Sequence, residues 1–288
     1  MQIKPSELIL NPDGSIYHLN LKPEHLANTI ITVGDPDRVK QVTQYFDSIE
    51  FSTQKREFHT QTGYYNNQRI SVISTGIGTD NIDIVFNELD ALVNIDLEKR
   101  IPKKQLTSLT IIRVGTSGTI QKNIPTNAFL AAESAVGFDS LLHYYQSDAI
   151  QNKALNQALS NQLKHLSKKA TPYTVDADST LLAKFSKHPA MHTGITATNV
   201  GFYAPQGRVL RAPLQDANFM ENLVSFQHNN RRITNLEMET SGIYGMAKLL
   251  GHKALSLNAI VANRVTGEFA MNPTKTVNQL IQFTLENL

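Results

Sequence analysis

The chain has 288 residues, of which 41% are hydrophobic and 18% are charged, so it can bury a sizeable core within one large α/β domain. A formal net charge of +2 excludes the strongly basic class of protein that binds nucleic acid through its phosphates. The absence of cysteine excludes a disulfide framework, a thiolate nucleophile and a cysteine zinc site.

The beginning of the chain, Met1 to Ser6, lacks the apolar stretch of a secretory signal, and no apolar run in the sequence reaches the length of a membrane span. We therefore expect a cytoplasmic protein without membrane contact. No repeat and no linker rich in Pro and Ser divides the sequence, so residues 1–288 are expected to form a single domain.

The first predicted strand, Thr29–Val33, is apolar and leads through Gly34 into a helix. Asp35 suits the N-cap of that helix and Pro36 its first position. Free N–H groups at a helix start attract phosphate, and Arg38 would add a charged fork one turn later. The alternative is that this segment only begins a helix and that Arg38 is a surface charge.

A second strand, Arg69–Thr75, is followed by Gly76-Ile77-Gly78 and by a predicted helix, Asn81–Val93, with apolar residues three and four apart. This order is also found at the start of dinucleotide-binding dehydrogenases. The third glycine of their fingerprint is missing here, which weighs against that alternative.

A third strand, Leu109–Val114, carries an arginine, Arg113, near its end. An arginine on an apolar strand is costly to bury without a partner. Together with the hydroxyl of Thr116 it forms a second candidate hook for phosphate. The alternative is an internal salt bridge from Arg113 to a carboxylate such as Asp80 or Asp83.

The rest of the chain continues the alternation of helices and strands, which predicts a three-layer α/β/α fold with a central mixed sheet. Sites in such folds form at the carboxyl ends of strands. The expected elements are a helix over Asn152–Lys169, a strand over Ile195–Ala197, a helix over Met238–Leu250 ended by Gly251, a strand over Ala254–Ala262 and a helix over Thr274–Leu288.

The segment Phe202–Arg208 contains Pro205 and Gly207, which favour a shaped loop over a regular helix. In it, Phe202 can stack on a flat ring. Gln206 offers a donor and an acceptor and Arg208 offers donors, which together match the edge of uracil. The alternative is a surface turn with a half-buried aromatic ring.

The segment Glu237-Met238-Glu239 lies at a predicted strand-to-helix junction. Its carboxylates can accept hydrogen bonds from the two hydroxyls of a ribose, and Met238 can pack on the sugar. The alternatives are acidic residues that merely suit a helix start and the acid/base pair of a glycosidase. The spacing of Glu237 and Glu239 favours ligands for a diol.

In this order, the motifs resemble those of nucleoside phosphorylases of the purine nucleoside phosphorylase/uridine phosphorylase superfamily, most closely the uridine phosphorylases. The resemblance runs from about His18 to the end of the chain. It rests on Tyr17-His18-Leu19, Gly34-Asp35-Pro36-Asp37-Arg38-Val39, Arg56-Glu57-Phe58, Ser74-Thr75-Gly76-Ile77-Gly78, Arg113-Val114-Gly115-Thr116-Ser117-Gly118, Phe202 to Arg208, Glu237-Met238-Glu239 and Asn263-Arg264.

The resemblance implies a role for each matched residue. Phosphate would be bound by Gly34, Arg38, Arg113 and Thr116, with Arg56 from a neighbouring subunit. Ribose would be bound by Glu237, Met238 and Glu239, with His18 from the neighbour. The base would be bound by Phe202, Gln206, Arg208 and Arg264. Catalysis would rest on Arg208, Gln206, Arg113 and Arg38.

The resemblance also implies the reaction, which is cleavage of uridine by phosphate into uracil and ribose 1-phosphate, a step of pyrimidine salvage. Deoxyuridine and thymidine are further candidate substrates. Purine-cleaving relatives carry an aspartate after the last apolar strand, where this chain has Asn263-Arg264. Alternatives on the same fold are a purine nucleoside phosphorylase, a nucleosidase that uses water and a non-catalytic nucleoside-binding protein.

Finally, the resemblance implies how the chain assembles and what it needs. Residues 1–25 would reach a neighbouring subunit in a homodimer or in a trimer of dimers. No cofactor is implied, because inorganic phosphate is a co-substrate. The only metal implied is a potassium ion held through Glu57 and Ser74.

Overall fold

Strands from both ends of the chain join one mixed sheet in the computed structural model, which describes residues 2–163 and 171–288. The strands of this twelve-stranded sheet are β1 Thr29–Val33, β2 Ser48–Lys55, β3 Phe58–Tyr65, β4 Gln68–Ser74, β7 Thr110–Thr119, β8 Phe129–Gly137, β9 Tyr173–Asp176, β10 Met191–Thr198, β11 Gln227–His228, β12 Arg231–Glu237, β13 Lys253–Asn263 and β14 Glu268–Phe269. A separate pair is formed by β5 Ile95–Asp96 and β6 Ile101–Pro102.

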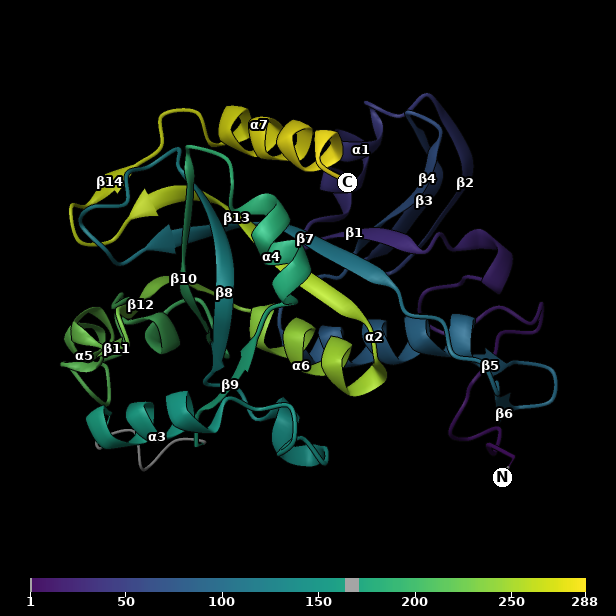
Figure 1. Cartoon of the computed structure of the whole chain (residues 1–288), viewed down its shortest axis with the longest axis horizontal. Coiled ribbons are helices and arrows are strands. Elements are labelled where there is room, and N and C mark those ends of the chain that lie inside the picture. Colours follow the sequence, from purple (N-terminus) through teal and green to yellow (C-terminus); the bar gives the residue numbers. More distant parts are fainter. Residues whose placement is uncertain (1, 164–170) are drawn as a thin grey trace.

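The helices cover this sheet. They are α1 Pro36–Thr43, α2 Thr79–Asn94, α3 Lys153–Gln162, α4 Ser179–Phe185, α5 Phe219–Ser225, α6 Thr240–Leu250 and α7 Pro273–Glu286, with 3-10 turns at η1 Pro23–His25, η2 Leu141–Tyr144 and η4 Ala204–Gln206. Figure 1 shows α1 and α7 on one side of the central strands and α2 and α6 on the other. This arrangement confirms the predicted α/β class with a central mixed sheet.

The strand order places β13, the last long strand of the chain, in the middle of the sheet between β8 and β7. The sheet runs β11-β12-β10-β8-β13-β7-β1-β4-β3-β2, and β1 is parallel to both β4 and β7. In addition, β12 pairs with β7 through Asn235 and Thr119, so that β7, β13, β8, β10 and β12 close into a ring. The sequence did not predict this closure, because a pairing between two distant strands leaves no local pattern.

Several predicted boundaries agree with the structure. The strand Thr29–Val33 and the helix start after it are confirmed, because the Asp35 side chain accepts a hydrogen bond from the Asp37 N–H and Pro36 is the first helical residue. The helix that Gly251 was expected to end does stop there, with Gly251 in the left-handed region at φ 79°.

Other boundaries differ. The third strand does not stop at Val114 but continues to Thr119, because β13 pairs with it along its whole length despite its glycines. The helix predicted from Asn152 to Lys169 covers Lys153–Gln162, and residues 164–169 of that prediction lie outside the described part. The helix expected from Met238 begins at Thr240, with Glu239 at its N-cap.

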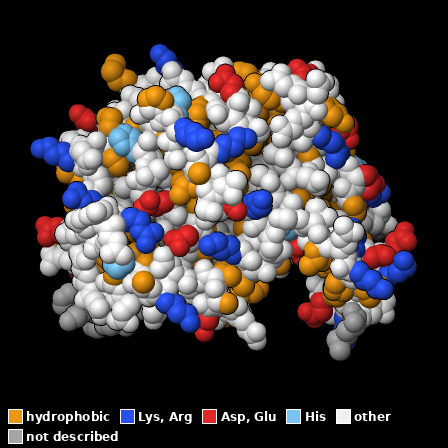
Figure 2. Space-filling view, in the orientation of Figure 1, with side chains coloured by type: hydrophobic (Ala, Val, Ile, Leu, Met, Phe, Trp, Pro, Cys, Tyr) orange, Lys and Arg blue, Asp and Glu red, His pale blue; other side chains and the backbone are white. Residues whose placement is uncertain are grey.

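The apolar core lies between the sheet and its two helical layers. It is built from central strands that are buried on both faces and from one face of α2, where Ile82, Val85, Phe86 and Leu89 are all fully buried. On the face shown in Figure 2, Lys and Arg side chains are interspersed with Asp and Glu, as the low net charge leads one to expect. No helix among the described residues is long and apolar enough to cross a membrane.

Candidate functional site

A cavity of about 770 Å³ opens where several strands of the sheet end. Its walls come from the β1–α1, β4–α2 and β12–α6 junctions, from the C-terminal parts of β7 and β13, and from the loop after β10. The predicted residues that line it are Gly34, Arg38, Glu57, Arg113, Thr116, Phe202, Gln206, Arg208, Glu237, Met238 and Glu239. Segments that are far apart in the sequence therefore meet in one space.

Four predicted residues are not among the lining residues. They are His18, Arg56, Ser74 and Arg264. The roles of His18 and Arg56 were expected in a neighbouring subunit, so their position outside this chain's cavity leaves those predictions as they stand.

Arg38 is the cation at one end of the cavity. It lies one turn into α1, and its guanidinium makes no hydrogen bond or ion pair with the described residues. Burial lowers the pKa of Arg38, and the positive charge of Arg113 lowers it further. A partly desolvated arginine without a carboxylate partner is well suited to an anionic ligand.

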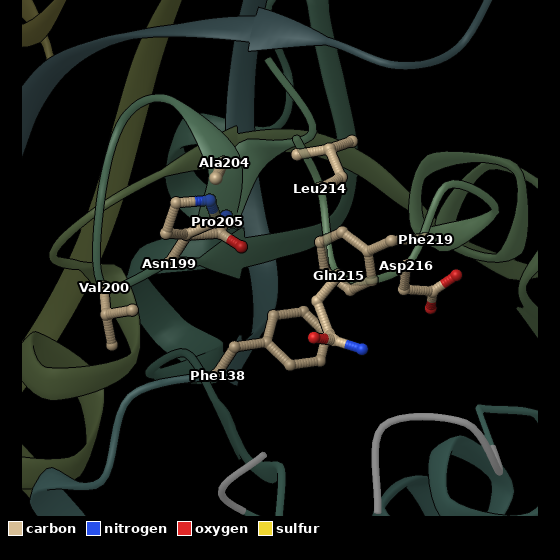
Figure 3. A pocket seen from close by; sticks show the side chains of 9 residues that line it. All are labelled: Phe138, Asn199, Val200, Ala204, Pro205, Leu214, Gln215, Asp216 and Phe219. Atoms are coloured by element: carbon tan, nitrogen blue, oxygen red, sulfur yellow. The ribbon is translucent and has the colours of Figure 1, made fainter. Parts of the chain in front are cut away.

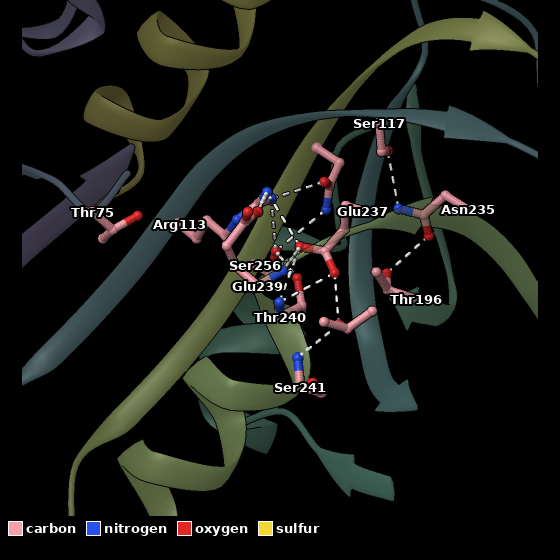
Figure 4. A network of polar contacts seen from close by, with 12 residues as sticks. Thr75, Arg113, Ser117, Thr196, Asn235, Glu237, Glu239, Thr240, Ser241 and Ser256 are labelled. Carbon is pink, nitrogen blue, oxygen red and sulfur yellow. Dashed lines mark hydrogen bonds and ion pairs between the residues drawn. The ribbon is translucent and has the colours of Figure 1, made fainter. Parts of the chain in front are cut away.

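Arg113, the second predicted phosphate ligand, is instead tied to two carboxylates (Figure 4). Its Nη2 lies 2.6 Å from Glu239 Oε2 and 3.2 Å from Glu237 Oε2. Its Nη1 donates to Asn258 Oδ1 at 3.0 Å. Arg113 therefore does form an internal salt bridge, as the alternative interpretation of the sequence predicted. Its partners are Glu237 and Glu239 and not Asp80 or Asp83.

Gly115 makes this geometry possible. Arg113 and Gly115 are two residues apart on β7, so both face the same side of the sheet. A Cβ atom on Gly115 would lie 2.0 Å from Arg113 Nη1, so any other side chain here would displace the guanidinium from this position. The glycine thus gives the guanidinium room to fold back along its own strand toward the glutamates.

Glu237 is anchored by the protein itself. Its Oε1 accepts from the Thr198 hydroxyl at 2.7 Å, and its Oε2 accepts from the N–H groups of Glu239 and Thr240, both at 2.9 Å. Glu237 is only 4% exposed. These bonds hold the carboxylate at the start of α6, where the helix dipole also favours a negative charge.

Glu239 has fewer partners within the chain. Its Oε1 accepts from the Gly78 N–H at 2.9 Å, and its Oε2 binds Arg113. Burial raises the pKa of Glu239, and the nearby carboxylate of Glu237 raises it further, while Arg113 partly offsets both. For Arg113, burial is outweighed by the two carboxylates, so its pKa is raised and the guanidinium stays charged.

Another wall of the cavity is formed by the segment Phe202–Arg208, here called the base loop. Arg208 Nη1 donates to the Phe202 carbonyl and to Gln206 Oε1, both at 2.6 Å. Its guanidinium carbon lies 3.8 Å from the centre of the Phe202 ring. Arg208 thereby fixes the orientation of the Gln206 amide, leaving the Gln206 NH₂ group and its own Nη2 as donors for a ligand.

Arg264 supports this loop from behind. Arg264 was predicted to bind the base, and in the structure its Nη1 donates to the backbone carbonyl of Gln206 at 3.0 Å. Burial lowers the pKa of Arg208 to about 10, and the positive charge of Arg264 contributes to that shift. Two unneutralised arginines next to each other give this end of the cavity a positive potential.

The shape of the base loop depends on Gly207. It has a φ of 67°, in the left-handed region, and ends the single turn Ala204–Gln206. A Cβ atom on Gly207 would also lie 2.2 Å from the side chain of Met220. The loop is therefore a defined turn, as its Pro and Gly predicted.

His18 is held in place by Glu88. The Glu88 carboxylate lies 2.7 Å from His18 Nδ1 and also accepts from the backbone N–H groups of His18 and Leu19. This leaves Nε2 of the imidazole to face away from Glu88. Arg56 is exposed, with a φ of 55°, in the turn between β2 and β3.

The predicted potassium ligands are close in the fold. The Ser74 hydroxyl donates to the Glu57 carbonyl at 2.6 Å and accepts from the His59 N–H at 2.7 Å. Within the described ranges, no group of three or more His, Asp or Glu side chains is arranged to hold a metal ion. The potassium site stays a prediction.

Asn263 lies where we expected an aspartate in a purine-cleaving enzyme, and its amide has structural partners. Its Nδ2 donates to the carbonyls of Gln121 and Ile124, and its Oδ1 accepts from the N–H groups of Val265 and Thr266. Asn263 is 2% exposed and is not a lining residue of the cavity. It orders the turn after β13 and leaves no side chain free to protonate a base.

The sequence missed the residues that support these ligands. Thr198 holds Glu237, the Gly78 N–H holds Glu239, and Asn258 holds Arg113. One signal was present, because Ser256 and Asn258 are polar residues on one face of an otherwise apolar strand. Polar side chains at such positions indicate a buried partner.

The comparisons with known proteins agree with this geometry. A family model described as "Phosphorylase superfamily" matches residues 28–284. The uridine phosphorylase of Thermococcus kodakarensis is 31% identical, over 89% of this chain and 80% of its own length. The DeoD-type purine nucleoside phosphorylase of Oceanobacillus iheyensis is 26% identical, over 94% of this chain and 98% of its own length.

Among solved structures, a nucleoside phosphorylase of Trypanosoma brucei, described as showing uridine phosphorylase activity, superposes with a TM-score of 0.86. It is 30% identical in sequence, and the match covers 98% of this chain and 100% of that one. The similarity therefore includes the whole cavity-bearing fold.

Proposed function

The chain belongs to the phosphorylase superfamily, and we propose that it uses phosphate to cleave the N-glycosidic bond of uridine. The products are uracil and ribose 1-phosphate, which makes the protein a pentosyltransferase of pyrimidine salvage. The observation that carries this proposal is the meeting of an unpaired arginine, a buried pair of glutamates and the Gln206–Arg208 pair in one cavity.

Phosphate binds at the Arg38 end of the cavity. Gly34 lets the backbone N–H groups at the start of α1 approach the anion, and Thr116 adds a hydroxyl from β7. Arg113 is near but is shared with two carboxylates, so Arg38 contributes most of this chain's attraction for the anion. Arg56 of a neighbouring subunit completes the site in our proposal.

The ribose lies between the phosphate and the base. Glu239 accepts hydrogen bonds from the two sugar hydroxyls, and Met238 packs on the sugar. Glu237, anchored by its own hydrogen bonds, keeps the β12–α6 junction in place. The His18 imidazole of the neighbour, oriented by its own Glu88, caps the 5′-hydroxyl. The sugar is thereby fixed with C1′ facing a phosphate oxygen, which reduces the entropic part of the barrier.

The base loop stabilises the leaving group. As the glycosidic bond breaks, negative charge spreads over O2, N3 and O4 of the pyrimidine. The Gln206 amide and the free N–H groups of Arg208 donate to that edge, Phe202 covers the ring, and Arg264 strengthens the positive field. Donors placed where charge develops lower the barrier most in a site of low dielectric.

A purine leaving group can be protonated at N7 as the glycosidic bond breaks. A pyrimidine has no N7, so its departure needs no such proton donor. Asn263 leaves no acid at the corresponding place, which favours uridine over a purine nucleoside. A water-using nucleosidase is disfavoured because it binds no phosphate anion for the unpaired Arg38 guanidinium to neutralise. A non-catalytic binding role is disfavoured because the phosphate, ribose and base ligands are all present.

We also propose that residues 1–288 act as one domain, that residues 1–25 reach a neighbour, and that the working unit is a homodimer or a trimer of dimers. His18 and Arg56 do not line the cavity of the chain they belong to, which leaves them available to complete the cavity of a neighbouring subunit. A cytoplasmic location, no cofactor and a potassium ion at Glu57 and Ser74 complete the proposal.

One assay tests this function. Purified protein is mixed with uridine, thymidine or inosine, with and without phosphate, and the free base is followed. We expect uracil release from uridine only when phosphate is present, with one ribose 1-phosphate formed per uracil. Equal release without phosphate would indicate a nucleosidase, and faster release from inosine would indicate a purine nucleoside phosphorylase.

A further inference from the structure

A second cavity, of about 300 Å³, lies behind the base loop. Its apolar walls include Phe138, Val200, Pro205, Leu214 and Phe219, and its polar lining residues are Asn199, Gln215 and Asp216 (Figure 3). None of its lining residues also lines the cavity proposed for uridine. The two cavities are therefore separate spaces on either side of one short loop.

Asn199 is the unusual residue of this cavity. It is 1% exposed, and its Nδ2 donates to the Ala197 carbonyl at 3.2 Å. Its Oδ1 is buried and has no hydrogen-bond partner among the residues that the structure describes. In Figure 3 this oxygen points toward the side of the cavity formed by Leu214, Gln215 and Phe219.

A buried acceptor without a donor is rare, because it gives up its bonds to water without replacement. A second acceptor at this cavity, Oδ2 of Asp216, is also buried without a partner within the described ranges. In Figure 3 the Asp216 carboxylate points away from Asn199. A molecule that fills the cavity therefore gains a hydrogen bond by bringing a donor to Asn199, and none of the described lining residues aims a charged group at the centre of the cavity.

The walls select a flat and neutral molecule. The rings of Phe138 and Phe219 lie with their centres 5.7 Å apart and their planes at 77°, so they form two faces of an aromatic corner. An engineered cavity of about 150 Å³ lined by apolar side chains binds benzene. A cavity of about 300 Å³ has room for one ring or for two fused rings.

We propose that this cavity is a second binding site, which takes a small, neutral, planar aromatic molecule with one N–H or O–H donor directed at Asn199 Oδ1. Binding alone does not depend on the function proposed above. It follows from the apolar walls and the unpartnered acceptor.

The position of the site couples it to the first cavity, and this part rests on the proposed function. The Asn199 N–H donates to the Glu237 carbonyl at 2.9 Å, and Pro205 in the wall precedes Gln206, which faces the other side. A ligand that fills the space behind the loop therefore changes how Gln206 and Arg208 meet the base. We expect it to alter the KM for uridine while the KM for phosphate stays unchanged.

The binding experiment uses indole, a neutral bicyclic molecule with one N–H, and benzofuran, which has the same shape but an oxygen in place of the N–H. Both are titrated by calorimetry into the full chain saturated with uridine in the absence of phosphate, so that the first cavity is occupied. We expect indole to bind with a Kd of about 0.1–1 mM and benzofuran to bind at least about tenfold more weakly.

Two variants locate the site. Leu214→Trp fills the cavity and should abolish indole binding, whereas Leu210→Trp places the same ring on an exposed position of the same segment and should leave it unchanged. Both variants should keep their kcat on uridine, because neither residue lines the first cavity, while the KM of Leu214→Trp for uridine is free to change as it does with a bound ligand. Turnover thus also shows that each variant is folded.

Some outcomes overturn the site. They are equal affinity for indole and benzofuran, retention of indole binding by Leu214→Trp, and no binding at millimolar indole. A crystal structure in which Asn199 Oδ1 keeps only an ordered water at that concentration would have the same meaning.

The coupling has its own outcome. Saturating indole should change the KM for uridine by at least about threefold, and an unchanged KM overturns the coupling while leaving the site. If the protein cleaved no uridine at all, the proposed function would fail, but the contrast between the two tryptophan variants would still decide whether the site exists.

Discussion

Glu239 Oε2 lies 2.6 Å from Arg113 Nη2, so a residue predicted to bind ribose and a residue predicted to bind phosphate form one buried ion pair. In the proposed function, the sugar and the anion are therefore bound by a single charge network and not by two independent sites. Glu237 shares the same guanidinium at 3.2 Å, which leaves this network with one more negative than positive charge. Arg38, beside this network, pairs with no carboxylate among the described residues.

Replacing Glu239 with Gln tests the network. The variant keeps the shape but offers the sugar hydroxyls a neutral and weaker acceptor, so we expect kcat/KM for uridine to fall about 10- to 100-fold. Arg113 retains Glu237 and Asn258, and we expect the free energy of unfolding to drop by only about 1–3 kcal/mol. Steady-state kinetics and denaturant unfolding measure the two effects.

The exposed Glu221 supplies the control, because Glu221→Gln makes the same chemical change away from the cavity and should alter neither quantity. With 2′,3′-dideoxyuridine as substrate, the loss caused by Glu239→Gln should largely disappear. A full loss on that substrate would show that Glu239 acts through something other than the sugar hydroxyls.

Arg38 is predicted to set the affinity for phosphate. Arg38→Ala removes the unpaired guanidinium at the start of α1, and we expect the KM for phosphate to rise about 10- to 100-fold while the KM for uridine changes little. Lys40→Ala removes an exposed cation from the same helix and should have no effect. A rise in the KM for uridine of equal size would place Arg38 at the sugar or the base instead.

Arg208 is predicted to act on the leaving group. Arg208→Ala should lower kcat on uridine by about 10²–10³-fold, comparable to the loss of one donor from an oxyanion hole. The exposed Arg211, three residues further on, gives the matched control Arg211→Ala, which should keep full turnover. Turnover by Arg208→Ala close to that of the unmodified protein would contradict the role.

The pH profile carries a separate prediction. Burial, with a contribution from Arg264, lowers the pKa of Arg208 to about 10, so kcat/KM for uridine should fall as the pH rises through that value. In Arg264→Met the repulsion is gone, and the fall should move to higher pH. A profile that Arg264→Met leaves unmoved would contradict the assignment.

The lowered pKa of Arg208 affects the free energy of unfolding in the opposite direction to activity as the pH rises. Because the pKa of Arg208 is lower in the folded chain than in the unfolded chain, the unfolded chain binds more protons above about pH 10. The contribution of Arg208 to the free energy of unfolding therefore increases with pH in that window. Loss of activity there is expected without loss of this contribution.

Local signals predicted much of the fold. Asp35 and Pro36 marked a helix start, and the spacing of Ile82, Val85 and Phe86 marked a buried helix face. The closure of the sheet through β7 and β12 and the continuation of β7 to Thr119 could not be predicted, because both depend on strands that are distant in the sequence.

The site shows the same limit. The types of ligand could be predicted, because an arginine on an apolar strand and two glutamates before a helix both indicate a polar site within the fold. Their mutual arrangement could not, because the partner of Arg113 lies 126 positions away at Glu239. Charge pairing across such a distance is decided by strand order, and a single sequence carries no record of it.

The central claim is that phosphate binds beneath Arg38 and that uracil is bound by Gln206 and Arg208 in the same cavity. A crystal structure with sulfate and uridine bound tests both parts at once. The account predicts the sulfate within hydrogen-bond distance of the Arg38 guanidinium and the Thr116 hydroxyl, with C1′ of the sugar facing it. A sulfate bound away from Arg38, or a uracil ring that does not contact the base loop, would contradict it.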